Sequence, residues 1–298
     1  MNTLIVGSSG KIGKFFFKIK KKNFFFTYFK KKIKNGIKFD LTKDDINLII
    51  DKYNIKKIIF LSAITDPDIC AKNKTLSRNV NVNMTKKIID KIIQRNIYFI
   101  FISSEFIYCG KKKNYKENSL AKPVNLYGKQ KLIIEKYLTK KYKNFCILRI
   151  AKTYSDELED KTLLTGYIRN ILSNKKKFYA SKNQIFNPLY VYDLIKIITF
   201  FLIKNKKGVF NVGGPKAYSR FEILRIVLNK INEKMIKNFN PAIKDVDLNS
   251  LMLIDKRPLN VSFNISKLKK NINFNLTSIN TVLDNIIKKN YASKFKKR

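Results

Sequence analysis

The sequence contains no histidine and no tryptophan. Without histidine, the chain cannot form a Ser-His-Asp hydrolase site, a zinc protease site of the HExxH type or any histidine general base. A catalyst built from this chain must therefore use tyrosine, lysine, cysteine or carboxylate side chains.

Cysteines and long apolar runs are also scarce. Cys70, Cys109 and Cys146 lie far apart without a metal-ligand spacing, which fits reduced thiols in a cytosolic protein. The most apolar stretch, Ile197 to Ile203, is far shorter than the ~20 residues that span a bilayer. The first residues lead directly into a strand-like segment, without a signal-peptide pattern. We therefore expect a cytoplasmic protein with no membrane partner, and we predict no metal site.

Acidic residues are few, with 21 Asp and Glu against 63 Lys and Arg, which gives a net charge of +42. Such a charge can indicate a nucleic-acid or anionic-membrane partner. However, the lysines are spread along the chain, and no nucleic-acid-binding motif accompanies them. Lys, Ile, Asn, Phe and Tyr are abundant, while Gly and Pro number only 10 and 6, which is the pattern of A/T-rich codons. We attribute the charge to this composition and expect no specific nucleic-acid partner.

A glycine-rich turn, GSSGKIG at residues 7–13, follows the apolar run at residues 3–6. Glycines at this spacing let the backbone turn sharply and approach a pyrophosphate at the start of a helix. The motif alone is weak evidence, but here it stands between a predicted strand and a predicted helix. A tight turn without a ligand is the alternative. The predicted cofactor residues of this turn are Gly7, Gly10, Lys11, Ile12 and Gly13.

A second predicted strand, at residues 24–29, ends in Lys30, Lys31 and Lys32. In dinucleotide-binding folds an acid at this place binds the ribose 2′-hydroxyl, whereas a basic residue accommodates a 2′-phosphate. The absence of an acid favours NADP(H), with Lys30 as its contact. Because lysine is abundant throughout the chain, NAD(H) stays open.

Further candidates follow the next predicted strands, at residues 37–39 and 58–61, because ligands bind at the carboxyl ends of strands in open α/β sheets. The first of these strands ends in an acid that could accept from an adenine amino group or simply stabilise a turn. A predicted helix at residues 75–94 carries an asparagine that is either solvated or bound to backbone near the site. These candidates are Asp40, Leu41, Ser62, Ala63 and Asn81.

Strands alternate with helical segments in six rounds over the first half of the chain. This alternation predicts an α/β fold with a Rossmann-type, doubly wound parallel sheet covered on both faces. The regularity falls after residue 150. We therefore predict a nucleotide-binding domain at residues 1–150 and a smaller C-terminal lobe at residues 151–298, interleaved with the first.

The stretch from Tyr98 to Glu135 reads as a buried strand, a polar loop and a helix. Ser104 stands at the end of the strand, and Tyr127 and Lys131 stand four residues apart on one face of the helix. An ammonium group near a phenol lowers the phenol pKa, which is ~10 in water. This spacing predicts a pair that transfers a proton to a substrate oxygen, with Ser104 holding that oxygen.

These motifs resemble the extended short-chain dehydrogenase/reductase superfamily, and more narrowly the dTDP-4-dehydrorhamnose reductase family. That family includes the regulatory subunit of methionine adenosyltransferase. The resemblance rests on GSSGKIG at 7–13, ITDPDICAKN at 64–73, VNVNMTK at 80–86, ISSEFIYCG at 102–110, YKENSLAKPVNLYGKQKLIIEK at 115–136 and ILRIAKTY at 147–154. Weaker similarity continues through NPLYVYDL at 187–194, GVFNVGG at 208–214 and RPLNVSFNISKL at 257–268.

The resemblance implies that Tyr127 and Lys131 are the catalytic pair, that both also contact the cofactor, and that the C-terminal lobe binds substrate. Ser104 occupies the usual place of a threonine, and Glu105 that of an aspartate, which makes its carboxylate one methylene longer. Gly7, Gly10 and Gly13 would contact the pyrophosphate, and Ser62 and Ala63 would line the cofactor channel. The implied substrate-binding residues are Ser104, Glu105, Asn187 and Arg257.

The implied function is NAD(P)H-dependent reduction of a nucleotide-linked 4-keto sugar, with dTDP-4-dehydrorhamnose to dTDP-rhamnose preferred, in cell-surface polysaccharide synthesis. Tyr127 would be the proton donor. Two alternatives stay open: a sugar-nucleotide epimerase or dehydratase of the same superfamily, and a non-catalytic NADP-binding regulatory subunit. The implied partner is a nucleotide sugar, and a homodimer is left open.

Overall fold

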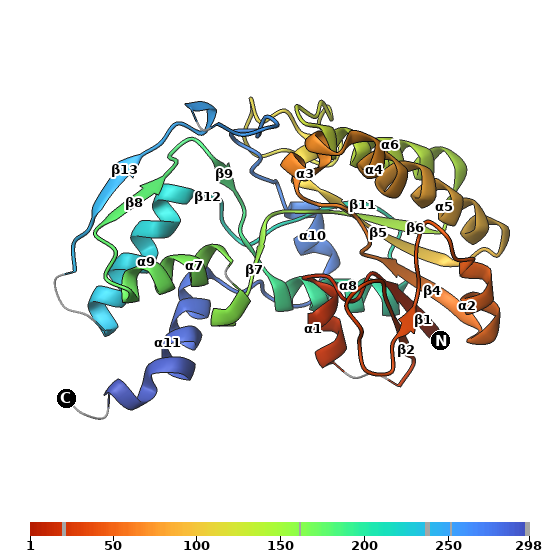
Figure 1. The fold of residues 1–298 in the computed structure, drawn as a ribbon, viewed down its shortest axis with the longest axis horizontal. Helices are drawn as coiled ribbons and strands as arrows, with labels where there is room; N and C mark the ends of the chain where they lie inside the picture. Colours follow the sequence, from red (N-terminus) through yellow and green to blue (C-terminus); the bar gives the residue numbers. More distant parts are fainter. Residues whose placement is uncertain (20–21, 161, 236–238, 251, 296–298) are drawn as a thin grey trace.

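The computed structural model describes residues 1–19, 22–160, 162–235, 239–250 and 252–295. Its centre is a seven-stranded parallel sheet with the strand order β11-β6-β5-β4-β1-β2-β3 (Figure 1). The strands are β1 (Asn2–Val6), β2 (Phe24–Tyr28), β3 (Ile37–Lys38), β4 (Ile55–Phe60), β5 (Tyr98–Ser104), β6 (Phe145–Ile150) and β11 (Gly208–Val212). The order reverses between β1 and β4, and a ligand crevice forms at such a reversal.

The strands are apolar on both sides because helices cover both faces of the sheet. Alternate residues of β1 show this division, since Leu4 and Val6 join one buried cluster and Ile5 joins the other. The first face is covered by α2 (Ile46–Lys52), α3 (Pro67–Lys72), α4 (Lys74–Arg78), α5 (Thr85–Gln94) and α6 (Leu126–Lys141) (Figure 1). The second face is covered by α1 (Gly13–Lys18), α8 (Val191–Lys204) and α10 (Ser266–Asn271). The predicted Rossmann-type fold is confirmed.

The predicted single helix at residues 75–94 differs from the structure. It begins at Lys74, and a π-helical segment, η1 (Asn79–Met84), separates α4 from α5. A π-helical turn inserts an extra residue into the helix, and such turns occur often at functional sites. Here the widened turn contains Asn81, a residue that is only 4% exposed.

The C-terminal lobe packs short strand pairs against α7 (Leu163–Leu172), α9 (Arg220–Lys234) and α11 (Ile279–Phe295), on the left of Figure 1. Strand β7 pairs with β10, β9 with β12, and β8 with β13. These strands are β7 (Thr153–Tyr154), β8 (Lys177–Ala180), β9 (Ile185–Phe186), β10 (Leu189–Tyr190), β12 (Tyr218–Ser219) and β13 (Ala242–Asp245). Three further short turns are the 3-10 helices η2 (Glu105–Ile107), η3 (Leu158–Asp160) and η4 (Leu248–Ser250).

The C-terminal half of the chain also contributes to the first lobe. Strand β11 pairs with β6 along its whole length, from Gly208 against Cys146 to Val212 against Ile150. Helices α8 and α10 cover the same sheet. None of the helices in the described ranges is both long and apolar enough to cross a bilayer.

Candidate active site

The end of β5 and the start of α6 lie against each other because of one glycine. A Cβ atom at Gly128 would stand 2.1 Å from the carbonyl oxygen of Phe106, so only glycine permits this approach. Asn125 caps the helix, since its Oδ1 accepts from the Gly128 N–H at 2.8 Å. The contact sets Tyr127, at the start of α6, beside Ser104, at the end of β5.

Tyr127 and Lys131 are both nearly inaccessible, at 7% and 6% exposed. Lys131 donates from Nζ to the carbonyl oxygen of Ile102 at 2.8 Å, and its Nζ lies 5.8 Å from the centre of the Tyr127 ring. Burial lowers the pKa of Lys131 to about 8, although nearby Glu135 acts in the opposite direction.

The phenol of Tyr127 differs from the expectation of a lowered pKa. Burial raises its pKa above the ordinary value, and the side-chain interaction with Ser104 offsets only part of this rise. The charge of Glu105 raises it further. Burial, which the sequence did not reveal, therefore keeps the Tyr127 phenol protonated.

Glu105 follows Ser104 and is 5% exposed. Its Oε2 atom is buried and has no hydrogen-bond partner within the described part of the chain. Burial raises its pKa to about 8, while the charge and backbone N–H of Lys152 act in the opposite direction. Glu105 is thus a carboxyl group with one unused oxygen at the edge of the site.

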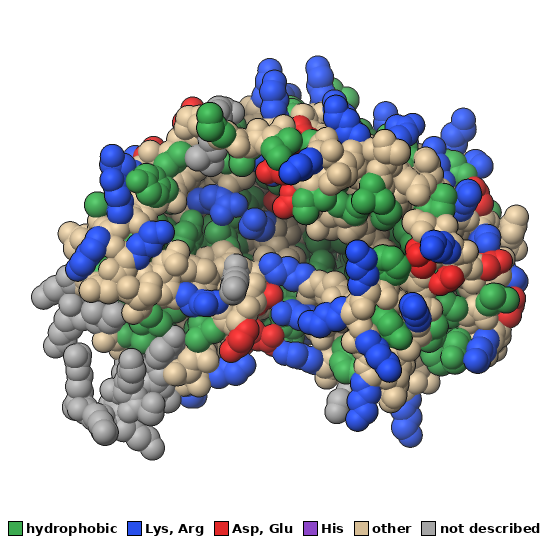
Figure 2. Space-filling model, in the orientation of Figure 1, with side chains coloured by type: hydrophobic (Ala, Val, Ile, Leu, Met, Phe, Trp, Pro, Cys, Tyr) green, Lys and Arg blue, Asp and Glu red, His purple; other side chains and the backbone are tan. Residues whose placement is uncertain are grey.

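These residues open onto a cavity of about 540 Å³ between the two lobes, visible as the central hollow in Figure 2, with Lys and Arg side chains along its rim. A neighbouring cavity of about 320 Å³ shares Gly7, Gly10 and Ala63 with it. The predicted residues that line the first cavity are Gly7, Gly10, Lys11, Ile12, Gly13, Ala63, Ser104, Glu105, Tyr127, Lys131 and Arg257. Those that line the second are Gly7, Gly10, Asp40, Leu41, Ser62 and Ala63.

The floor between the two cavities is made of backbone. Gly7 has φ +87°, and a Cβ atom there would lie 2.8 Å from the Ser62 nitrogen. A Cβ atom at Gly13 would lie 2.4 Å from the Ser8 carbonyl oxygen. Glycine is therefore required at both positions, and the backbone between the two cavities carries no side chain at these points, so this region could hold a dinucleotide.

Three predicted site residues lie outside both cavities. The side chain of Asn81 binds the backbone of Ile64, accepting from its N–H at 2.8 Å and donating to its carbonyl oxygen at 2.9 Å. It also donates to the Gln130 side-chain oxygen at 2.7 Å, so Asn81 joins the loop after β4 to α6. This geometry agrees with the alternative of a backbone contact near the site.

Asn187 and Lys30 are the other two. Asn187 is buried, accepts from the Phe263 N–H at 2.7 Å and donates to the Gly214 carbonyl oxygen at 3.3 Å. Its polar atoms therefore join segments of the chain, and it lines neither cavity, so its contact with substrate stays a prediction. Lys30 is exposed just beyond β2, with its Nζ 5.8 Å from the centre of the Phe29 ring.

Sequence reasoning missed several residues that line the main cavity. Lys152 comes two residues after β6, and Gln184 and Arg220 come from the C-terminal lobe. The rule that ligands bind beyond the carboxyl ends of strands could have found Lys152. Nothing in the spacing of the sequence marks the other two.

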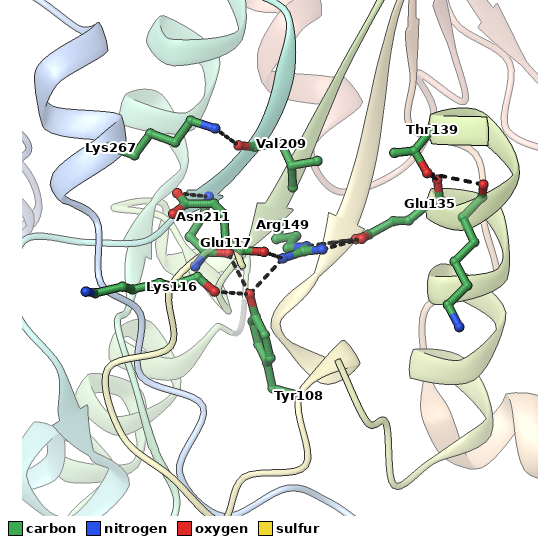
Figure 3. Close-up of polar contacts among 10 residues, drawn as sticks. Tyr108, Lys116, Glu117, Glu135, Thr139, Arg149, Val209, Asn211 and Lys267 are labelled. Atoms are coloured by element: carbon green, nitrogen blue, oxygen red, sulfur yellow. Dashed lines mark hydrogen bonds and ion pairs between the residues drawn. The ribbon is translucent and has the colours of Figure 1, made fainter. Parts of the chain in front are cut away.

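A buried ion pair supports α6 behind the site (Figure 3). Arg149 on β6 contacts Glu135 on α6 through two nitrogens, the shorter contact being 2.7 Å. Arg149 also donates to the Tyr108 hydroxyl and to the Glu117 carbonyl oxygen, both at 2.8 Å. Glu117 in turn accepts from the Asn211 N–H on β11 at 3.0 Å. One network thus joins α6, two strands and the loop before α6.

The fold and the site together define a protein of the extended short-chain dehydrogenase/reductase class. Within that class, the chain belongs to the family described as RmlD substrate binding domain, whose model matches residues 1–292. The described residues contain no group of His, Cys, Asp and Glu side chains that could hold a metal ion.

Two kinds of named relative are similar to the chain. Methionine adenosyltransferase 2 subunit beta of Pongo abelii is 24% identical over 77% of this chain and 69% of its own length. The bovine protein of the same name is covered over 59% of its length. The dTDP-4-dehydrorhamnose reductase of Aggregatibacter actinomycetemcomitans is 24% identical over 78% of this chain and 80% of its own length.

Solved structures share the fold over nearly the whole chain. A hypothetical dTDP-4-dehydrorhamnose reductase from Sulfolobus tokodaii has a TM-score of 0.81 and 27% identity, with 95% of this chain and 98% of that one covered. The Bacillus anthracis dTDP-4-dehydrorhamnose reductase, solved with NADP, has a TM-score of 0.81 and 19% identity, covering 97% and 100%. MoeE5, solved with UDP-glucuronic acid and NAD, has a TM-score of 0.78 and 17% identity, covering 95% and 97%.

Replacing Arg149 by Met should lower the free energy of unfolding by about 3–5 kcal/mol, because it leaves the Glu135 carboxylate buried without its partner. The double variant Arg149→Met/Glu135→Leu should lose much less unfolding free energy than Arg149→Met alone, because it leaves no buried charge unpaired. The exposed pair of Arg95 and Asp51, 3.1 Å apart, is the control, and Arg95→Met should cost less than about 1 kcal/mol. Urea unfolding measures all three, and equal losses in Arg149→Met and Arg95→Met would contradict this account.

Replacing Glu105 by Gln should make stability less sensitive to alkaline pH. The pKa of Glu105 rises from 4.5 to about 8 on folding, so the folded state holds a proton that the unfolded state releases between these values. The contribution of Glu105 to stability therefore falls as pH rises through this window. The melting temperature of Glu105→Gln relative to wild type should increase between pH 5 and pH 9, and a constant difference would show that Glu105 titrates normally.

Proposed function

We propose that this protein reduces the 4-keto group of a nucleotide-linked sugar with NAD(P)H, and that Tyr127 donates the proton to the substrate oxygen. The observation that carries the proposal is that Ser104, Tyr127 and Lys131 meet at one cavity, which continues into the glycine-lined trough. Because a named relative is a dTDP-4-dehydrorhamnose reductase, dTDP-4-dehydrorhamnose is the first substrate to test. The proposed reaction would then belong to the synthesis of cell-surface polysaccharide.

Each of the three side chains has a distinct part in this reaction. Tyr127 stays protonated because it is buried, which suits a proton donor. The Ser104 oxygen accepts from the Phe106 N–H at 3.2 Å, and its hydroxyl also interacts with the Tyr127 phenol, so both groups would contact the same sugar oxygen. Lys131, held at the Ile102 carbonyl, stabilises the phenolate that remains after the proton leaves.

The cofactor, when bound, supplies the hydride to the carbon of the keto group. Gly7, Gly10 and Gly13 would lie against its phosphates, and Asp40 would lie at its adenine end. NADP(H) is favoured over NAD(H), because the segment after β2 offers Lys30, Lys31 and Lys32 and no acid.

A second candidate function is a cofactor-binding regulatory subunit without turnover. The observation that favours it is the similarity to methionine adenosyltransferase 2 subunit beta. In this case the protein would bind NADP(H), show no sugar reduction, and co-purify with a catalytic methionine adenosyltransferase subunit. Co-expression with such a subunit, followed by size-exclusion chromatography, tests it.

Replacing Tyr127 by Phe should reduce turnover of dTDP-4-dehydrorhamnose by about 10²–10⁴-fold, because the phenol proton is lost while packing is kept. NADPH oxidation followed by absorbance measures the rate at saturating NADPH, and NADPH fluorescence measures how far cofactor binding is kept in the variant. Tyr137→Phe on the same helix is the control, since its hydroxyl contacts Asp90 away from the cavity. Full activity in Tyr127→Phe would refute the proton-donor assignment.

NADPH should bind about tenfold more tightly than NADH, through charge-assisted contacts to the 2′-phosphate. Replacing Lys30, Lys31 and Lys32 together by Gln should weaken NADPH binding and leave NADH binding unchanged. Lys56→Gln, near the amino end of β4 and so at the end of the sheet away from the glycine-rich turn, should change neither affinity. Equal affinity of the wild-type protein for both cofactors, measured by fluorescence titration, would overturn the preference.

A further inference from the structure

Three basic side chains of the main cavity belong to none of the ion pairs found among the described residues. Lys11, Lys152 and Arg220 line this cavity and also its side branch of about 300 Å³ beside α7. None of them forms an ion pair with a carboxylate in the part of the chain that the structure describes. By contrast, Arg257 on the same wall pairs with Asp68 at 3.0 Å. Unpaired cations that converge on a cavity are a site for an anion.

Arg220 is held in place by neutral groups. It is the first residue of α9, directly after Ser219, which caps the helix together with Glu222. Its Nε donates to the Gln184 side-chain oxygen, and its guanidinium lies 5.9 Å from the centre of the Phe186 ring. The charge of Arg220 also acts on the Glu105 carboxyl, but burial raises the pKa of Glu105 to about 8, so this acid is mostly protonated at neutral pH. The guanidinium therefore stays available to a carboxylate or phosphate.

Lys152 lies close to the reacting groups. It comes two residues after Ile150, which pairs with Ser104 across the neighbouring strands. The charge and backbone N–H of Lys152 act on the Glu105 carboxyl, and the charge of Glu105 acts on Tyr127. Lys152 and Tyr127 therefore both act on the same acid, and Lys152 is an exposed residue that lines the cavity. An anion at Lys152 would stand near the sugar oxygen that Tyr127 protonates.

The chemistry of a hexose decides which anion this is. In a nucleotide sugar the diphosphate is attached to carbon 1, across the ring from the keto group at carbon 4. Carbon 6 is attached to carbon 5, directly beside the keto group. In dTDP-4-dehydrorhamnose carbon 6 is an uncharged methyl group, which would leave Lys152 and Arg220 without a partner next to the reacting carbon.

We propose that the preferred substrate carries a carboxylate at carbon 6, as in a nucleotide-linked uronic acid, and that Lys152 and Arg220 bind this carboxylate. This inference rests on the proposed function and narrows its substrate class. Lys11 lies on the glycine-rich turn, where we expect it to contact the cofactor phosphates. Lys152 and Arg220 are therefore the two cations assigned to the sugar. Both act in binding and specificity, and Tyr127 still delivers the proton.

The test compares binding of glucose and glucuronic acid linked to the same nucleoside diphosphate, for both dTDP and UDP. Isothermal titration of the NADPH-loaded full-length protein gives the dissociation constants without turnover. The wild-type protein should bind the glucuronic acid compound about tenfold more tightly than the glucose compound. Lys152→Gln should remove most of this difference and leave the affinity for the glucose compound within about twofold.

Three further variants complete the design. Arg220→Gln should reduce the same preference, and Lys152→Arg, which keeps the charge, should retain it. Lys56→Gln, near the amino end of β4 and so at the end of the sheet away from the cavity, should leave both affinities unchanged. Thermal unfolding of each variant confirms that it is folded before its affinities are compared.

Two outcomes would overturn the inference. Equal wild-type affinity for both sugars would show that no carboxylate site exists. Equal weakening of both sugars by Lys152→Gln would show that the cations hold the diphosphate instead. If NADPH binds but neither nucleotide sugar does, the proposed function itself fails. This result differs from the two outcomes that would overturn only the carboxylate site.

Discussion

The contact between Arg149 and Glu135 is the interaction on which the site depends. Burying two charges is costly unless they are paired and their remaining hydrogen-bonding atoms are satisfied. Here Tyr108 and Glu117 satisfy the other nitrogen of Arg149, so the pair fixes α6 to β6 and to the loop before α6. Lys131 stands one turn before Glu135 on that helix. The same pair therefore holds the helix in place and sets the electrostatic surroundings of Lys131.

The fold was predictable because its signals are local. Apolar strands, the glycine turn at residues 7–13 and the spacing of Tyr127 and Lys131 each depend on a few neighbouring residues. The pKa of Tyr127 was not predictable, because burial depends on how the lobes close over it. The contacts of Asn187 were not predictable for a similar reason, since only the packed structure shows that Phe263 and Gly214 contact its polar atoms. Arg220 reaches the cavity through tertiary packing that no spacing encodes.

The strongly basic composition has different meanings at different places. On the face that Figure 2 shows, Lys and Arg side chains are dispersed, as expected from a codon bias that needs no ligand. Lys57, in contrast, is buried and donates to the Leu202 carbonyl oxygen at 2.6 Å, so it closes the end of α8. Lys131 and Lys152 face the cavity with lowered pKa values. Position and partners, more than abundance, identify the lysines that have a specific task.

The pairing of β11 with β6 has a consequence for biosynthesis. Residues 1–150 contain the trough and the Ser-Tyr-Lys group, yet the outer edge of β6 stays unpaired until residue 212 has been made. An open, apolar strand edge invites association with other chains. On the ribosome, the nucleotide-binding half must therefore wait for about sixty later residues, a delay that a non-local strand pairing imposes on folding. It follows from this topology that the nascent chain needs chaperones, and that a fragment ending at residue 150 does not fold stably.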